Sequence, residues 1–444
     1  MSQHLLLIAD SDSQLLAAQA LAEAARGLGA AVTVNAIPRE GTPMAVLAAL
    51  QRGGSLWRQT VAQLLADPRL DQFSGIGVYL TGSKLAEFRS TYHLSCQQRR
   101  RPLRPLFCGF NGVVLERFEE AIAWRLGYDL ICLNGPRDQQ RLEELLRCTP
   151  FTAQRSVITG LRRQGLSEHP QSPGAIQANE ERPRQLVFAE QVVMPSAPEE
   201  RRRMVQLLAR LARRSPHWQV LIKPRVAPHE TTFHTVETHI SQTLREALGS
   251  PPANLQLSYE PLPELLRRSR LLATVSSTAL FDALDLGCQP VVMADFGLRQ
   301  DLGTPFFAGS GLLRRFADAE DLDDLEQGLA VERAWLEWVG YHPSFGAANL
   351  LQALEDWAAA PAEPLPLQRP GYGINAADLS ANQLRRGAEN AIRSRDYAEA
   401  ERLLEIARLQ RPDHQNIRRR LRAVRCSNRL LRRLALLVTP GFRA

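Results

Sequence analysis

The sequence from residue 271 to residue 293, LLATVSSTALFDALDLGCQPVVM, decides the fold of the second half of the chain. It begins with a short apolar run typical of a buried strand and passes through Ser276, Ser277 and Thr278 into an amphipathic segment. The expected order is a strand, a polar turn, a helix ending at Gly287 and a second strand. In an open α/β sheet, strand ends and helix starts bind anions because unpaired backbone amides point outward there. The polar turn is therefore a candidate phosphate site.

Two cations follow a neighbouring predicted strand in the sequence LIKPR. Lys223 and Arg225 would stand at the same edge of the sheet as the polar turn. The first acidic residue after the turn is Asp282, so no Glu or Gln closes a capping box, and the helix amides are predicted to be available to a ligand. The alternative is that a serine of the turn merely caps the helix while both cations are solvated.

Length and composition are those of a globular protein with several domains. A chain of 444 residues can form two or three cores, and contents of 44% hydrophobic and 23% charged residues are ordinary. No stretch resembles a signal peptide or a membrane span, so we expect a cytoplasmic protein. The six cysteines are widely spaced without a CxxC pair, which argues against a disulfide framework or a zinc cluster.

The net charge of +7 is concentrated near the C-terminus. Residues 376–444 contain 16 Arg, no Lys and seven acids, a balance of +9 that leaves −2 for residues 1–375. A nucleic-acid enzyme would carry its positive field around its active site. The distribution predicts that nucleic acid is not a partner and that the basic segment has a separate role.

Alternating strand and helix patterns predict an α/β fold of two doubly wound parallel sheets. In the first half, strands are expected at 4–9, 31–35, 75–80, 105–110 and 129–133, and helices at 14–28, 60–65 and 116–125. After a Pro-rich linker, strands are expected at 185–189, 219–222 and 255–257, and helices at 198–214 and 235–248. Two Rossmann-like halves would face each other across a cleft, where small ligands bind.

A second Pro-rich linker precedes an Arg-rich segment with helical patterns. Tyr397, Ala400, Ala407 and Pro412 have the spacing of a tetratricopeptide helical hairpin, and one such unit is too short for a solenoid. The terminal run NRLLRRLALLVTPGFRA is basic and amphipathic. We expect it either to touch anionic lipid or a partner protein, or to cover the repeat with its Arg face in water.

The motifs, taken in order, resemble those of a known enzyme class. QLVFAEQVVMP, WQVLIKPR and the run from PLPELL to QPVVM resemble the donor half of GT-B glycosyltransferases, closest to the capsule and polysialyltransferase type. IADSDSQ, FCGFNG and RLGYDLICLNGP resemble a group of uncharacterised bacterial proteins classed as glycosyltransferases. The resemblance covers roughly residues 1–357 and implies an acceptor domain (1–165) and a nucleotide-sugar donor domain (185–357). Composition places a linker at 166–184, a second linker at 358–374 and a helical module at 375–444.

In the polysialyltransferase-like families, a Lys-Pro-His-Pro motif and a Ser-Ser/Thr motif hold the phosphate of a CMP-activated sugar. Lys223 and Pro224 match the first motif, whereas Arg225 and Val226 replace its histidine and second proline. Arginine can bind phosphate with two hydrogen bonds, but it cannot act as a general acid near neutral pH. The resemblance implies that the nucleotide phosphate is bound by Lys223, Arg225, Ser276, Ser277 and Thr278.

Sugar transfer also needs a base for the acceptor proton, and three carboxylates are candidates. Asp10 and Asp12 follow the first strand, although they could instead cap the next helix. Glu190 follows the first strand of the second domain. Gly82 and the GFNG turn with Asn111 are candidate contacts to the donor or acceptor, although turn geometry alone also explains such glycines.

No metal site is predicted. His229 and His234 are five positions apart, so HETTFH does not place two ligands on one helix face as HExxH does. His229 is a candidate donor or acceptor contact in place of the missing motif histidine. Two cations and a helix start could stabilise the leaving phosphate without a metal ion or a cofactor.

The sequence therefore predicts a metal-independent GT-B glycosyltransferase of cell-surface polysaccharide synthesis. It would move a sugar from a nucleotide-sugar to a glycan or a lipid-linked acceptor. Its helical module would dock on a partner protein or an anionic membrane, and the enzyme could be peripheral on the inner face of that membrane. The alternatives are a sugar-nucleotide epimerase, a CDP-glycerol-type glycerophosphotransferase and a non-catalytic scaffold.

Overall fold

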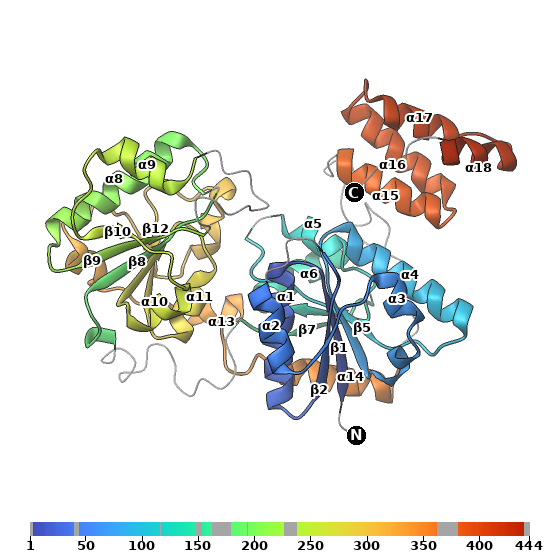
Figure 1. Ribbon diagram of the computed structural model, residues 1–444, viewed down its shortest axis with the longest axis horizontal. Coiled ribbons are helices and arrows are strands. Elements are labelled where there is room, and N and C mark those ends of the chain that lie inside the picture. The colour runs from blue at the N-terminus through green and yellow to red at the C-terminus, as the bar shows by residue number, and fades with distance from the viewer. Residues whose placement is uncertain are drawn as a thin grey trace. The chain divides into compact units, whose positions relative to one another are not determined.

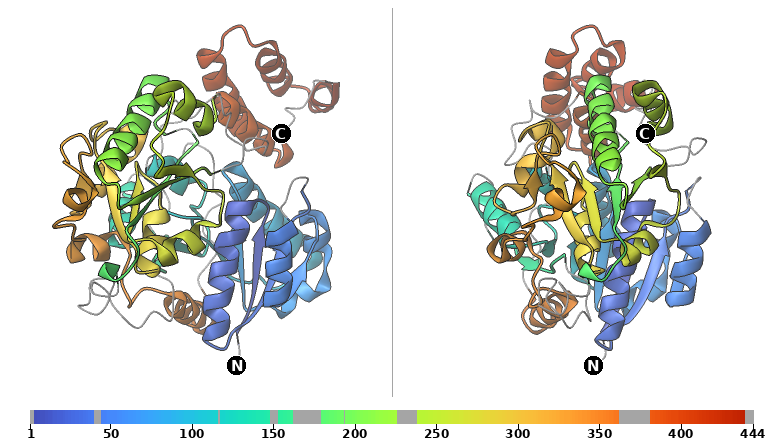
Figure 2. Two further views of the ribbon diagram at one scale, coloured as in Figure 1. Left: turned by 60° about the vertical axis from the view of Figure 1, so that its left-hand side comes forward. Right: turned by 90° about the vertical axis from the view of Figure 1, so that its left-hand side faces the viewer.

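The computed structural model describes residues 3–39, 44–115, 117–147, 153–161, 179–192, 194–225, 238–361 and 381–438. The chain divides into two compact units. The first comprises Met1–Thr159 with Phe345–Ala444, and the second comprises Gly160–Ser344. Each unit contains a parallel sheet with helices on both faces, and a separate group of helices ends the chain (Figures 1 and 2). The predicted class, two doubly wound α/β domains plus a C-terminal α-helical module, is confirmed.

The sheet of the first unit has seven parallel strands in the order β3-β2-β1-β4-β5-β6-β7. The strands are β1 (His4–Ala9), β2 (Ala31–Ala36), β3 (Ser55–Trp57), β4 (Gly75–Tyr79), β5 (Leu106–Cys108), β6 (Leu130–Leu133) and β7 (Ser156–Ile158). The helices around it are α1 (Asp12–Gly27), α2 (Met44–Gly53), α3 (Val61–Ala66), α4 (Ser83–Arg99), α5 (Phe118–Ala123), α6 (Pro136–Leu146), the 3-10 helix η1 (Pro68–Gln72) and α14 (Ala347–Ala359).

The central strand β1 is buried on both of its faces. Leu6 and Ile8 pack into a core shared with α3 and α4, whereas Leu5 and Leu7 pack into a second core shared with α1 and α2. Successive strand residues point to opposite faces, so a strand covered on both sides must be continuously apolar. This explains the unbroken apolar run at the start of the chain.

The late helix α14 returns to the first sheet. Leu350 and Leu354 are buried in the core beside α1, and the Asn349 side chain donates to the carbonyl of Ile158 (3.0 Å). The sequence analysis placed residues up to 357 in the second domain, whereas the structure places the segment from Phe345 onward in the first unit. The apolar face of α14 packs on a surface that exists only once the first sheet has formed. The sequence of α14 alone therefore does not show which of the two sheets it packs against.

The sheet of the second unit has six parallel strands in the order β10-β9-β8-β11-β12-β13. The strands are β8 (Gln185–Ala189), β9 (Gln219–Lys223), β10 (Leu255–Leu257), β11 (Leu271–Thr274), β12 (Gln289–Met293) and β13 (Leu313–Arg314). The helices are α8 (Pro198–Arg214), α9 (Ile240–Leu248), α10 (Leu262–Arg268), α11 (Ala279–Asp285), α12 (Leu322–Glu326), α13 (Arg333–Val339) and the 3-10 helices η2 (Gln300–Leu302) and η3 (Thr304–Phe307).

The predicted strands are all present, and several of the elements that the sequence analysis missed have physical explanations. Strands β3, β7 and β13 have three residues or fewer and lie at the ends of the sheets, where little burial shapes their sequence. Helix α4 buries Arg89 and Tyr92 together with its leucine and phenylalanine, which weakens its apolar periodicity.

The helix predicted at 235–248 begins at Ile240 as α9, and residues 226–237 lie outside the described part of the chain. Most of both predicted linkers also lies outside it, at residues 162–178 and 362–380.

The C-terminal module consists of the helices α15 (Ala381–Arg393), α16 (Tyr397–Gln410), α17 (Gln415–Val424) and α18 (Arg429–Val438). Consecutive helices pack on one another around a core that includes Leu384, Leu403 and Leu404. Ala400 and Ala407 are fully buried in this core, as a helical hairpin requires. The predicted hairpin is present, and its tetratricopeptide character stays a prediction. Within the described ranges, no helix has the length and apolar content needed to cross a bilayer.

His93 on α4 should make the first unit less stable in mild acid. Burial, with a smaller contribution from Arg89, lowers the pKa of His93 to about 4 from its ordinary value of 6.5. The unfolded chain therefore takes up a proton before the folded chain does, and stability present above pH 6.5 is lost as the pH falls towards 4. Between pH 6.5 and 4 we expect the free energy of unfolding, measured with urea, to fall by up to about 3 kcal/mol. In the variant His93→Gln it should fall by less over the same pH range. Equal pH slopes in the two proteins would contradict this.

Candidate functional site

Both sheets have a strand order that reverses beside the first strand of the unit. The chain moves outward to one side and then to the other, so the order changes direction between β1 and β4 and between β8 and β11. Ligands of open α/β sheets bind outside the carboxyl ends of the strands at such switch points. The residues that follow these four strands, and β9 beside them, are therefore where a functional site is expected.

The polar turn after β11 is held by side chains of the protein itself. The amide of Ser276 donates to Oε1 of Gln191 (3.0 Å). The amide of Ser277 donates to Oγ1 of Thr274 (3.1 Å), and Oγ of Ser277 accepts from the amide of Ala279 (3.2 Å). The prediction that these amides are available to a ligand is therefore wrong. A missing capping box does not leave amides unpaired when neighbouring side chains supply acceptors.

The hydroxyls of this turn differ in their exposure. Ser276 is buried, and its hydroxyl lies 3.3 Å from Nε2 of Gln191 and 3.2 Å from the sulfur of Met194. Ser277 and Thr278 are only partly buried, and the Thr278 side chain makes no capping hydrogen bond to α11. Contacts to a phosphate at this turn would therefore come from the side chains of Ser277 and Thr278, with Ser276 as a structural support.

Lys223 and Arg225, the two cations predicted to stand near the polar turn, lie across β8 from that turn. Lys223 is the last residue of β9 and pairs in register with Ala189 of β8, whose carbonyl accepts from Oγ1 of Thr274 in β11 (3.2 Å). The ends of β9 and β11 are thus two strand spacings apart, roughly 10 Å. The Lys223 ammonium donates to the carbonyl of Pro224 (2.7 Å), and Arg225 is exposed. Long cationic side chains and a phosphate can bridge this span.

Lysine is rare in this chain and is found where a ligand is expected. Of the 54 basic residues only two are lysines, Lys84 and Lys223. Lys223 ends β9, and Lys84 lies in the first turn of α4, directly after β4. An ammonium is a compact, strongly hydrated charge, unlike the planar guanidinium used elsewhere in the chain. The placement of both lysines beside switch points singles out these two positions.

Glu190, a predicted catalytic base, is held in a buried ion pair. Its Oε1 lies 2.6 Å from Nη2 of Arg201, and both side chains are less than one-tenth exposed. Nη1 of Arg201 also donates to the carbonyls of Gln191 and Val192 (3.2 Å each). The backbone amide of Arg225 donates to Oε2 of Glu190 (3.5 Å). These contacts favour a role in holding the residues that directly follow β8 and β9 over a role in accepting a substrate proton.

Asp10 at the end of β1 has the contacts expected of a reactive carboxylate. It is 4% exposed, and its Oδ2 pairs with the Lys84 ammonium at 2.5 Å. Its Oδ1 is buried without a hydrogen-bond partner among the described residues. Such a group costs free energy unless a ligand or a reaction uses it. The proposed alternative, a cap on α1, is not observed, because Ser11 is the N-cap and makes no side-chain cap bond.

The other predicted residues of the first unit lie around the same edge. Asp12 is the first residue of α1, and its side chain is outside the described part of the structure. Nδ2 of the exposed Asn111 donates to Oγ of Ser13 (3.2 Å), so the turn after β5 reaches the start of α1. Gly82 has a φ of 51° before α4, with open space where a Cβ would be. This glycine is therefore explained by backbone geometry.

His229 lies outside the described residues, as does His234, so the structure gives no contact for either. Within the described ranges, no group of three His, Cys, Asp or Glu side chains could hold a metal ion. Cys108 and Cys288 are not candidate nucleophiles, because burial raises the pKa of each thiol to about 12.

The two doubly wound α/β units, each with polar side chains at its strand ends, have the fold that the sequence analysis expected of a GT-B enzyme. Residues 5–358 match the family described as "Putative glycosyltransferase (DUF6716)", and the chain belongs to this family. It is therefore an enzyme of the glycosyltransferase class. No curated protein matches the chain.

Several solved structures are similar to the chain at low identity. A "putative UDP-N-acetylglucosamine 2-epimerase" from Listeria monocytogenes is 14% identical, with 82% of this chain and 98% of that chain covered and a TM-score of 0.48. HepE from Anabaena, solved with UDP and glucose, is 11% identical, with coverage of 80% and 98% and a TM-score of 0.48. MurG from Acinetobacter baumannii is 10% identical, with coverage of 80% and 99% and a TM-score of 0.45. These likenesses carry no assignment of substrate.

Proposed function

We propose that this glycosyltransferase takes its sugar from a nucleotide-sugar whose phosphate binds at the edge formed by β9 and β11. Lys223, Arg225, Ser277 and Thr278 would make the phosphate contacts. The observation that carries the proposal is the position of Lys223 and of the hydroxyl turn on either side of β8, beside a Rossmann switch point. Charge-assisted hydrogen bonds of this kind are worth about 1.5–3 kcal/mol each.

The reaction requires charge stabilisation on one reactant and proton removal from the other. The bond between the anomeric carbon and the donor phosphate oxygen breaks, and its electron pair leaves with the nucleotide. The acceptor oxygen forms the new bond to the anomeric carbon and loses its proton to a base. In this proposal Lys223 and Arg225 stabilise the leaving phosphate, and Asp10 of the first unit takes the proton.

The substrates are proposed at the level that the sequence resemblance suggests. The acceptor is a glycan or a lipid-linked sugar of cell-surface polysaccharide synthesis, and the enzyme works in the cytoplasm without a cofactor. Two cations at the phosphate supply the charge stabilisation that a metal ion gives in other transferases. The resemblance to capsule and polysialic acid enzymes names CMP-sugars as the first donors to test, with UDP-, GDP- and CDP-sugars beside them.

The two lysines allow a direct test, because an amine-reactive acetylating reagent can modify only Lys84, Lys223 and the N-terminus. Bound CMP, UDP, GDP or CDP should slow acetylation of Lys223, read by mass spectrometry, while Lys84 reacts at its unliganded rate. Lys223→Ala should weaken the affinity for the protecting nucleotide roughly tenfold to hundredfold. Failure of every nucleotide to protect Lys223 at saturating concentration would remove the proposed phosphate site.

Transfer is then separated from the alternatives by product analysis. A transferase releases free nucleotide from the donor only when an acceptor is present, whereas an epimerase converts the sugar-nucleotide without one. A glycerophosphotransferase would release CMP from CDP-glycerol with an acceptor. A scaffold would release nothing and would be insensitive to Lys223→Ala in the cell.

A further inference from the structure

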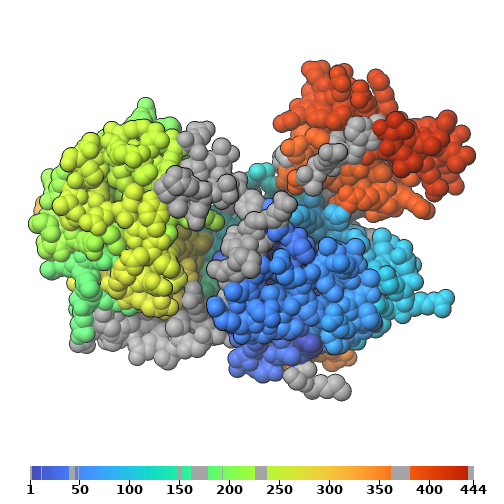
Figure 3. Space-filling view, in the orientation of Figure 1, coloured from blue at the N-terminus to red at the C-terminus, as the bar shows by residue number. Residues whose placement is uncertain are grey.

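The last described helix, α18, presents its apolar side outward. Five side chains of this helix are between 56% and 83% exposed, namely Leu430, Leu431, Leu434, Leu437 and Val438. In the space-filling view, the dark red end of the module, which includes α18, forms part of the surface (Figure 3). A face of this size on a globular protein marks an interaction site.

The outward orientation is fixed by contacts on the opposite side of α18. Leu436 packs against the core of the module, and the Arg432 guanidinium lies 4.6 Å from the centre of the Tyr397 ring. Nη1 of Arg420 in α17 donates to the carbonyl of Leu436 (2.6 Å). The sequence alternative, a helix that covers the repeat with its Arg face in water, is met only in part, because Arg429 and Arg433 are exposed while Arg432 is not. One arginine of α18 faces the module, and the leucines face away from it.

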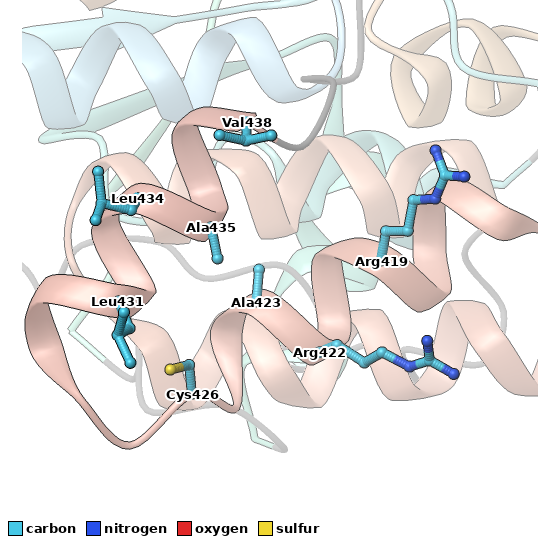
Figure 4. Close-up of a pocket in the computed structure, with 8 residues that line it drawn as sticks. All are labelled: Arg419, Arg422, Ala423, Cys426, Leu431, Leu434, Ala435 and Val438. Carbon is cyan, nitrogen blue, oxygen red and sulfur yellow. The ribbon is translucent and has the colours of Figure 1, made fainter.

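The apolar surface continues into a hollow between α17 and α18. The hollow has a volume of about 600 Å³ and is lined on the α18 side by Leu434, Ala435 and Val438. Figure 4 shows Ala423 of α17 opposite these residues, with the side chains of Arg419 and Arg422 extending along the α17 border. An apolar floor is thus bordered by guanidinium groups on one side.

The other border is also basic. Arg429 and Arg433 are four residues apart on α18 and therefore form one row, next to the row of Leu430, Leu434 and Leu437. Both arginines are exposed, as are Arg419 and Arg422.

The four border arginines are Arg419, Arg422, Arg429 and Arg433. Residues 415–438 contain eight arginines and no acid. Three of the eight, Arg418, Arg420 and Arg425, pair with carboxylates of the preceding helices and turns. Among the described residues, no carboxylate pairs with any of the border arginines.

The positive charge of the border arginines decides which partner the surface formed by α17 and α18 can bind. A second copy of the chain would bring its own four border arginines against the first four, and these like charges repel one another. An anionic surface instead satisfies both parts of the patch, since the leucines enter its apolar layer while the arginines bind phosphate. The exposed helix is about 15 Å long, enough to lie in a membrane interface but too short to cross a bilayer.

We propose that the surface formed by α17 and α18 docks the enzyme on a bilayer that contains anionic phospholipid. The proposal stands independently of the donor and acceptor assignments. A short apolar helix gives weak membrane binding alone, and basic residues beside it add about 1 kcal/mol each near an anionic surface. Binding should therefore need both the leucines and the arginines, and should weaken as salt is added.

The test uses the full chain and flotation with vesicles of phosphatidylcholine alone or mixed equally with phosphatidylglycerol. The protein should bind the mixed vesicles and not the neutral ones. The double variant Arg429→Gln/Arg433→Gln should lose roughly thirtyfold in vesicle affinity. The variant Leu434→Gln/Leu437→Gln should lose roughly a hundredfold or more, because each leucine no longer enters the apolar layer.

Matched controls come from the same module. Leu409 is 67% exposed on α16, and Arg411 is exposed beyond its end, so Leu409→Gln and Arg411→Gln make the same changes away from the patch. They should bind mixed vesicles like the unaltered protein, and all variants should keep its melting temperature. Three results would each overturn the proposal: equal binding to neutral and mixed vesicles, no effect of the patch variants, or a dimer that only the leucine variant dissociates. Binding of an acidic protein to this patch without vesicle binding would overturn it as well.

Discussion

Asp10→Asn should lower kcat by roughly a hundredfold to ten-thousandfold, the range that a positioned general base contributes. The amide keeps the shape of the side chain but cannot take a proton. Asp10 is the candidate because it directly follows β1 at the switch point, and because its Oδ1 is buried without a partner among the described residues. Turnover is measured as acceptor-dependent nucleotide release.

The same substitution should leave donor binding unchanged, which separates proton removal from phosphate binding. Nucleotide affinity and the protection of Lys223 from acetylation should match the unaltered enzyme. Asp138 provides a matched control, since it is also buried, pairs with an arginine (Arg137, 2.9 Å) and has an Oδ2 without a hydrogen-bond partner in the described part of the chain. It lies on α6 after β6, away from the switch point, so Asp138→Asn should change kcat only a few-fold. Equal losses in both variants would show that the effect of Asp10 is structural.

The fold could be predicted because each central strand is a local signal. Strands buried on both faces read as continuous apolar runs, and the polar residues that follow such runs must lie at one edge of the sheet. This logic identified Asp10, Lys223 and Ser277 without any knowledge of their neighbours. A prediction of this kind succeeds for a residue whose position in the fold is set by the strand directly before it.

The contacts that give these residues their roles could not be read in the same way. Lys84 is 74 positions from Asp10, and Gln191 is 85 positions from the amide of Ser276 that it satisfies. No periodicity or fixed spacing in the sequence marks either pair of residues, because each contact forms only when two strands that are distant in the sequence become neighbours in the sheet. The prediction of open amides at the serine turn failed for this reason. The sequence analysis did not identify Lys84, although the rarity of lysine in this chain is a composition signal that could have singled it out.

Glu190→Gln should destabilise the second unit by about 3–5 kcal/mol, because it leaves the charge of Arg201 buried without its carboxylate. The loss is measured by hydrogen exchange of the β8 and β11 amides, which reports the second unit separately from the first. Glu264 is an exposed acid on α10, and Glu264→Gln should stay within about 0.5 kcal/mol.

Stability and turnover, measured together on Glu190→Gln, then show whether Glu190 has a structural or a catalytic role. If it anchors the loops, the folded fraction of Glu190→Gln should retain turnover within about tenfold at a temperature well below its melting point, since Arg201 still donates to the carbonyls of Gln191 and Val192. A catalytic base gives the opposite pattern, with unchanged exchange rates and a loss of turnover as large as that expected for Asp10→Asn. That second pattern would move the proton acceptor from the first unit to the second. It would leave the pairing of Asp10 with Lys84 as a structural contact.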